Sequence, residues 1–164
     1  MSTAMGGTDG LERRLARLES LEEIRRLVGL YALGADRRND PEIFAGLYTE
    51  DAVWEAAGFG RFQGRELIVS ELARIGRETI VWTLHYMTSP VIDIDEDGEG
   101  ARCRWWLWEL SKIKDQPGDE PVAHFLGGTY DTRLKRAPNG WRFCHVTLDL
   151  PLISPHEPGF KTRP

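Results

Sequence analysis

The sequence has few of the features that mark metal-binding, secreted or membrane proteins. Its 164 residues include two cysteines, Cys103 and Cys144, and neither lies in a CxxC or Cys/His cluster. We therefore expect no metal site and a reduced, cytoplasmic chain, with a disulfide left open as an alternative. No apolar run reaches the roughly 18 residues of a membrane span, so we expect no membrane association. Residues 1–10 also lack the apolar core of a signal sequence.

Basic residues are not in excess, and the common nucleotide-binding and nucleophile motifs are missing. The formal net charge is -5, whereas a phosphate-binding surface needs clustered lysine and arginine. Arginines 13, 14, 17, 25 and 26 alternate with glutamates, which is typical of solvated helix faces. We therefore expect no nucleic-acid partner. The GxSxG elbow, the P-loop and the dinucleotide-binding fingerprint are absent.

Helical patterns fill the first half of the chain. Leucines at 11, 15 and 18 predict a short leading helix, and Ser20 with Glu23 predicts a capping box that starts a second helix ending near Arg37. Asp40 followed by Pro41 predicts a short third segment that ends near residue 48. A further helix is expected over 65–75, with Gly76 as its stop.

Strand patterns follow. Residues 52–55 and 59–62 flank Gly58 and predict a short hairpin. Residues 81–94, 101–114, 122–136 and 141–150 are rich in β-branched and aromatic residues and are separated by turn sequences, which predicts a meander of four long strands. The fold class is therefore α+β: a curved antiparallel sheet packed on three N-terminal helices and enclosing a pocket. We expect one domain over 11–150, a disordered tail over 1–10 and a C-terminal tail over 151–164.

Two residues stand out as candidates for catalysis. Asp36 lies four residues after Ala32 and eight after Val28, on the apolar face of its helix, where a carboxylate must be paired. His85 lies in the middle of an aromatic and apolar strand. Each has an ordinary structural explanation, a helix-end polar contact or a satisfied core histidine. If both point into one pocket, the carboxylate orients the imidazole, and the other ring nitrogen is free to take a proton.

The remaining polar and aromatic candidates have weaker patterns. His124, His145 and His156 are not spaced as metal ligands. The pattern fits an inward and an outward position of the His124 side chain equally well. Tyr130 is a candidate phenolic hydrogen-bond donor. Alternation places Trp106 and Trp108 on one face of their strand and Trp105 on the other. An exposed aromatic sheet face favours a homo-oligomer, a dimer or a trimer.

Three segments resemble the SnoaL-like branch of the nuclear-transport-factor-2-like superfamily. They are Tyr31–Glu42, Leu47–Trp54 and Gly60–Gly64, and the similarity extends over about 21–150. The segments around Asp36 and His85 are similar to those that carry the Asp–His pair of hexachlorocyclohexane dehydrochlorinase. Scytalone dehydratase has a comparable pair and a second pocket histidine, which this chain lacks on the strand around Trp105. The resemblance implies a cone fold, an acid–base role for both residues and no cofactor.

These observations lead to three hypotheses about function. The first is a cofactor-independent lyase or isomerase, in which His85 removes a proton from a small, mostly apolar cyclic substrate and Asp36 orients His85. Tyr130 or His124 would hydrogen-bond to the developing charge. The second is a noncatalytic binding or oxygenase accessory subunit, and the third is an epoxide hydrolase, for which Arg104 and Arg133 are the available arginines. The expected pocket walls are Trp54, Phe62, Trp82, Met87 and Phe125.

Overall fold

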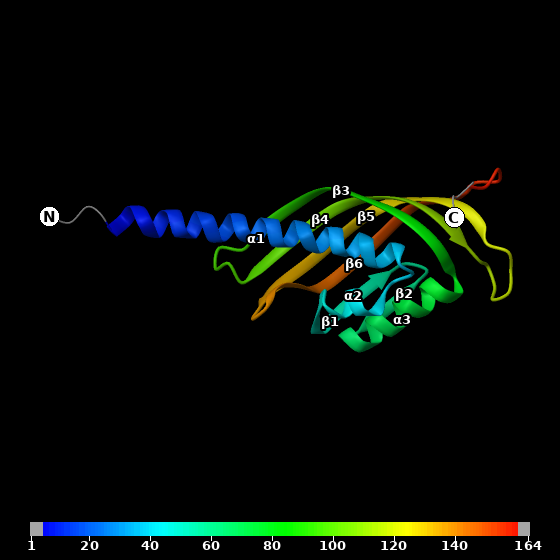
Figure 1. The fold of residues 1–164 in the computed structure, drawn as a ribbon, viewed down its shortest axis with the longest axis horizontal. Helices are drawn as coiled ribbons and strands as arrows, with labels where there is room; N and C mark the ends of the chain where they lie inside the picture. The colour runs from blue at the N-terminus through cyan, green and yellow to red at the C-terminus, as the bar shows by residue number, and fades with distance from the viewer. Residues whose placement is uncertain (1–4, 161–164) are drawn as a thin grey trace.

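The computed structural model describes residues 5–160, with side chains from residue 10 onwards, and shows helices on one side of a curved sheet (Figure 1). The elements are α1 (Met5–Asp36), α2 (Pro41–Ala45), β1 (Tyr48–Ala56), β2 (Gly60–Gln63), α3 (Arg65–Glu78), β3 (Ile80–Ile94), β4 (Gly100–Ile113), β5 (Val122–Ala137) and β6 (Gly140–Pro155). The α+β class predicted from the sequence is confirmed. No helix within residues 5–160 is long and apolar enough to cross a membrane.

The six strands form one open sheet in the order β2-β1-β6-β5-β4-β3. The predicted meander β3-β4-β5-β6 is antiparallel throughout, and the hairpin β1-β2 is also antiparallel. However, β1 pairs with β6 in parallel. The sheet is therefore mixed, because the helix α3 and three long strands separate β1 from its partner and allow it to approach in either direction.

The two predicted N-terminal helices form one continuous helix. The expected cap at Ser20 is instead in the middle of α1, where its hydroxyl donates to the Ala16 carbonyl at 2.7 Å and leaves the helix unbroken. Helix α1 begins at Met5, within the segment assigned to a disordered tail, whereas residues 1–4 and 161–164 lie outside the described residues.

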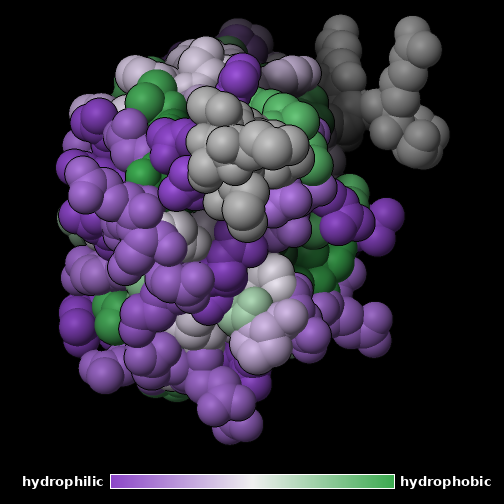
Figure 2. All heavy atoms as spheres, turned by 90° about the vertical axis from the view of Figure 1, so that its left-hand side faces the viewer, coloured by the Kyte–Doolittle hydropathy of each residue, from purple (hydrophilic) through white to green (hydrophobic). Residues whose placement is uncertain are grey.

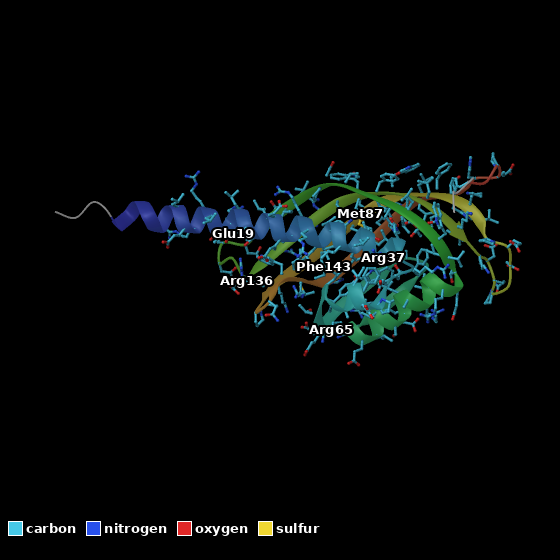
Figure 3. The ribbon with its side chains drawn as sticks, in the orientation of Figure 1. Glu19, Arg37, Arg65, Met87, Arg136 and Phe143 are labelled. Atoms are coloured by element: carbon cyan, nitrogen blue, oxygen red, sulfur yellow. The ribbon has the colours of Figure 1, made fainter. Side chains whose placement is uncertain are left out.

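The first half of α1 projects beyond the sheet (Figure 1). Its leucines at 11, 15 and 18 are exposed, so the apolar spacing there does not mark a buried face. The view from that end shows a mostly hydrophilic surface with scattered hydrophobic patches (Figure 2). Arg136, near Glu19 in Figure 3, donates to the Ser20 hydroxyl at 2.6 Å where α1 leaves the sheet.

The second half of α1 packs against the sheet and forms the core. Its buried residues are Ile24, Leu27, Val28, Tyr31 and Ala35, as their spacing predicts. Tyr31 meets aromatic rings of the sheet, with its centroid 5.3 Å from that of Tyr130 and 6.0 Å from that of Phe143. Because Tyr31 and Asp36 are on adjoining turns of one helix, this packing fixes where the carboxylate of Asp36 lies.

Close contacts between the residues that follow α1 and helix α3 hold the end of α1 in place. Asn39 adopts a positive φ of 56° and donates from its side chain to the Leu72 carbonyl at 2.8 Å. Gly76 does not stop α3, which continues to Glu78. A Cβ at Gly76 would lie 2.4 Å from the Arg38 carbonyl oxygen, so this glycine permits the close approach of the two segments.

The C-terminal strand is longer than its sequence pattern predicts. Strand β6 runs to Pro155, because residues 152–155 pair with residues 124–127 of β5. Part of the segment assigned to a tail is therefore strand. Cys103 is buried and Cys144 is half-buried, and both are free thiols, which decides against a disulfide between them.

Candidate active site

The last residue of α1, Asp36, directs one carboxylate oxygen at strand β3. Oδ1 of Asp36 accepts the backbone N–H of His85 at 2.9 Å and lies 3.2 Å from the Thr83 hydroxyl. The same oxygen lies 2.7 Å from Nδ1 of His85. Three donors from one strand therefore hold this carboxylate, whose side chain is 27% exposed.

His85 is held at both ring nitrogens. Nδ1 faces Asp36, and Nε2 lies 3.2 Å from Oε2 of Glu109 on β4. The nitrogen that the sequence analysis expected to be free is thus occupied. Burial by itself lowers the pKa of His85, but the hydrogen bonds and charges of the two carboxylates outweigh it and raise the pKa to about 9. At neutral pH, His85 is therefore an imidazolium that donates to both carboxylates.

Glu109 was not identified from the sequence. Its side chain is 5% exposed, and Oε1 accepts a hydrogen bond from the buried Ser111 hydroxyl. In the β3–β4 register, Glu109 is the direct partner of His85. A signal for it exists, because strand alternation puts Glu109 on the same face as the buried Trp105, and a glutamate at an inward position needs a partner.

His85 and Glu109 line a small apolar cavity of about 60 Å3, and Asp36 contacts His85 from outside that lining. That volume is well below the roughly 300–1,000 Å3 of typical ligand pockets, so a ring-sized ligand requires the walls to open. Its polar lining residues are Tyr31, Asn39, Thr83, His85, Glu109 and Tyr130. Its apolar lining includes Trp54, Phe59, Leu72, Ile75, Leu126 and Leu148.

Two of the other predicted site residues line this cavity, and two lie behind it. Trp54 and Tyr130 are lining residues. Burial raises the pKa of Tyr130 well above its ordinary value, so its phenol remains protonated. Phe62 stacks on Trp54 with ring centroids 5.6 Å apart, and Met87 is partly buried against the core. Phe62 and Met87 support the walls without forming them.

Three predicted site residues lie away from the cavity, which corrects the sequence-based assignment. Phe125 stacks on Trp108 at a centroid distance of 5.6 Å and lies 5.4 Å from Phe160. Trp82 also packs against Phe160, at 6.3 Å. Trp82 and Phe125 alternate with the inward-facing His85 and Leu126 and therefore project from the outer face of the sheet. His124 is half-buried, and its Nδ1 lies 2.9 Å from the Val122 carbonyl oxygen. His124 pairs with the buried Ser111 across β4 and β5 and does not line the cavity.

A second histidine–carboxylate pair lies elsewhere in the sheet. Nε2 of His145 on β6 is 2.7 Å from Oε1 of Glu55 on β1. The two side chains are 41% and 33% exposed, and Arg61 approaches the same carboxylate at 3.4 Å. Neither His145 nor Glu55 lines the cavity. Within the described part of the chain, no three His, Cys, Asp or Glu side chains are arranged to hold a metal ion.

Comparison with known families identifies the fold family. Residues 16–147 match the SnoaL-like domain family. The chain is a SnoaL-like protein. This confirms the family resemblance read from the sequence, and the match contains Asp36, His85 and Glu109. No curated protein sequence matches this SnoaL-like chain.

Solved structures similar to this SnoaL-like protein include a dehydrochlorinase and a protein named for scytalone dehydratase. Hexachlorocyclohexane dehydrochlorinase LinA-type3 from Novosphingobium barchaimii is 18% identical, with a TM-score of 0.81 over 92% of this chain and 99% of that chain. A protein from Novosphingobium aromaticivorans named for scytalone dehydratase is 21% identical, with a TM-score of 0.71 over 90% and 92%. A nuclear-transport-factor-2-like protein from Salmonella enterica reaches 0.68 at 18% identity over 80% and 90%. At these identities the similarity establishes the fold.

Proposed function

We propose that this protein is a lyase or isomerase that acts without a cofactor on a small, mostly apolar cyclic molecule. The observation that carries this proposal is the 2.7 Å contact between Asp36 Oδ1 and His85 Nδ1 at the wall of an apolar cavity. A buried imidazole oriented by a carboxylate is suited to acid–base catalysis. Two structural relatives are named for a dehydrochlorinase and a dehydratase, which agrees with elimination chemistry.

The reaction would begin with loss of a proton from a carbon beside a carbonyl or a leaving group. Asp36 and His85 form the centre of the acid–base group, and the apolar walls exclude water and strengthen its electrostatic effect. Tyr130 has a protonated phenol in the same cavity, so it is the residue we assign to hydrogen-bond the negative charge that develops on the substrate. His124 is not assigned this role, because it does not line the cavity.

The two alternative functions have less support. A noncatalytic binding or accessory subunit has no need of a buried His85 that is paired with Asp36. An epoxide hydrolase needs an arginine beside its carboxylate, but Arg104 and Arg133 are both exposed and neither lines the cavity. The lyase or isomerase function uses the groups that do line it.

The test is turnover of candidate substrates by matched variants. Wild-type protein is incubated with chlorinated cyclohexanes and hydroxylated cyclic ketones, and chloride release and product masses are followed. We expect Asp36→Asn and His85→Gln each to lower kcat/KM by about 10²-fold or more, while His145→Gln, in the second pair, retains the wild-type value. Near-wild-type turnover by either cavity variant would show that the acid–base proposal is wrong. Binding without turnover by the wild type would favour the accessory subunit.

We also propose that the outer face of the sheet joins a second copy of this chain. Tyr86, Trp106 and Trp108 are 50%, 51% and 44% exposed, and Tyr86 and Trp108 are directly paired across β3 and β4. Contiguous exposed aromatic side chains are typical of association surfaces. Light scattering should give a dimer or trimer mass for the wild type and a lower mass for Trp106→Asp. A monomeric wild type would refute the association.

A further inference from the structure

The least expected group in the cavity is the carboxylate of Glu109. It comes from the middle of β4 and is 5% exposed. Its partners are the His85 imidazole and the Ser111 hydroxyl, and it lines the cavity beside Tyr130. Burying a carboxylate is costly unless it is paired, so its position calls for an explanation beyond packing.

The charge balance shows that Glu109 is not needed to neutralise His85. Asp36 is closer to the ring, at 2.7 Å against 3.2 Å, and one carboxylate balances one imidazolium. With both carboxylates ionised, the three groups carry a net charge of -1 and can accept one more proton. Asp36 already receives the His85 backbone N–H, the Thr83 hydroxyl and the ring, whereas Glu109 has fewer donors, so Glu109 is the better acceptor.

We infer that Glu109 is a further catalytic residue, the group that takes the proton from the substrate carbon, while His85 holds and polarises it. This inference rests on the proposed function and assigns the proton-accepting step within it. The substrate class is a carbon acid with an apolar ring, which enters the cavity when its walls open. His85, held by Asp36, then acts as a hydrogen-bond donor to Glu109 throughout the step.

The step balances without an added reactant. The substrate C–H bond breaks, and an O–H bond forms on Glu109. The electron pair of the C–H bond forms a double bond and expels the leaving group with its own electron pair, or it delocalises onto a carbonyl oxygen near the Tyr130 phenol. The proton then leaves Glu109 with the leaving group, or returns to another carbon in an isomerisation.

A general carbon acid provides a probe that does not depend on the natural substrate. With 5-nitrobenzisoxazole, a base removes the C3 proton, the N–O bond breaks, and a coloured cyanonitrophenolate is released. The charged and titratable groups that face Glu109 and His85 are Asp36 and Tyr31 from α1 and Tyr130 from β5. Burial raises the pKa of both tyrosines, so neither is a base at neutral pH.

The pH dependence of the wild-type rate separates the two possible bases. If Glu109 takes the proton, kcat/KM for this probe has reached its plateau at neutral pH and does not rise further towards pH 9. If His85 takes it, the rate is low at pH 7 and is still rising at about pH 9, where the imidazolium loses its proton. The second profile overturns the inference and leaves the proposed function standing.

Variants give an independent answer. Glu109→Gln should lower the rate by about 10² to 10⁴-fold, and the matched Glu55→Gln change in the exposed pair should have no effect. Formate should restore a rate that rises with its concentration in Glu109→Ala, which a merely structural role would not produce. The inference fails if Glu109→Gln equals wild type while Asp36→Asn and His85→Gln lose activity. If all three equal wild type, the proposed function fails with it.

Discussion

Two histidine–carboxylate pairs of equal length lie in this molecule, and they differ in almost every other respect. Nδ1 of His85 is 2.7 Å from Asp36, and Nε2 of His145 is 2.7 Å from Glu55. The His85 side chain is 8% exposed and that of His145 is 41% exposed. The first pair joins a helix end to a strand beside a cavity, and the second joins two neighbouring strands.

A third charged group lies next to each pair, and its sign explains the difference in chemistry. At the buried pair, the third group is another carboxylate, Glu109, and the pKa of His85 rises to about 9. At the exposed pair, the third group is the cation Arg61, 3.4 Å from Glu55. The His145 hydrogen bond, despite some loss of solvation, holds the pKa of Glu55 below its ordinary value. A short distance alone therefore does not make a candidate site, whereas burial with surplus negative charge does.

The largest expected difference between the pairs is in the pH dependence of stability. Folding raises the pKa of His85 from 6.5 to about 9, so its stabilising contribution is fully present below about pH 6.5 and is lost as the pH rises through 9. The difference corresponds to about 3 kcal/mol. Urea unfolding at pH 6 and pH 10 should show that wild type loses about 3 kcal/mol more than His85→Gln.

The exposed pair provides the control for this measurement. Folding lowers the pKa of Glu55. The resulting stabilisation is therefore present at pH values above the pKa of Glu55 in the unfolded chain, and it is lost as the pH falls through the lower pKa of the folded protein. Glu55→Gln should therefore change the acid side of the stability profile and leave the alkaline loss intact. Equal alkaline losses in wild type and His85→Gln would show that His85 is not protonated in the folded protein.

Periodicity predicted the element types and both members of the buried pair. The helical phase of Ile24, Val28 and Tyr31 put Asp36 on the packed side of α1. Of the four long strands, the first three have ends within one residue of those predicted, and the last, β6, continues to Pro155. The exposed end of α1 could not be predicted in this way. A leucine stripe has the same spacing on a projecting helix as in a core, and only the length of the sheet decides where packing ends.

The site was predicted less well, because its residues come from several strands and the face on which each side chain lies must be worked out for every strand. His85 and Met87 share one face of β3, and Trp82 is on the other by alternation, so Trp82 could not share a pocket wall with His85. The same rule places Glu109 inward with Trp105. That Glu109 meets His85 depends on the β3–β4 register, which no local pattern in either strand specifies.

A smaller effect is expected at the two threonines that flank the histidines. The Thr83 hydroxyl is 3.2 Å from both Asp36 Oδ1 and the Ala35 carbonyl, and the Thr147 hydroxyl is 3.3 Å from Glu55 Oε1. Thr83→Val keeps the side-chain shape and removes a part-buried donor, which should cost about 1 kcal/mol of unfolding free energy. Thr147→Val removes a donor that water can replace, so its change should stay within about 0.5 kcal/mol.

Turnover makes the same comparison sharper. Without the Thr83 hydroxyl, Asp36 keeps the ring and backbone donors of His85. The Asp36–His85 pair therefore remains in contact, but one hydrogen bond fewer holds the carboxylate in position. We expect kcat/KM for 5-nitrobenzisoxazole to fall by about 2- to 10-fold, which equals about 0.4 to 1.4 kcal/mol in the barrier, and to be unchanged in Thr147→Val. Equal rates in both variants would mean that the strand alone positions the carboxylate. A large loss in Thr147→Val would mean that the exposed pair affects the cavity through the shared sheet, and the contrast between the pairs would no longer hold.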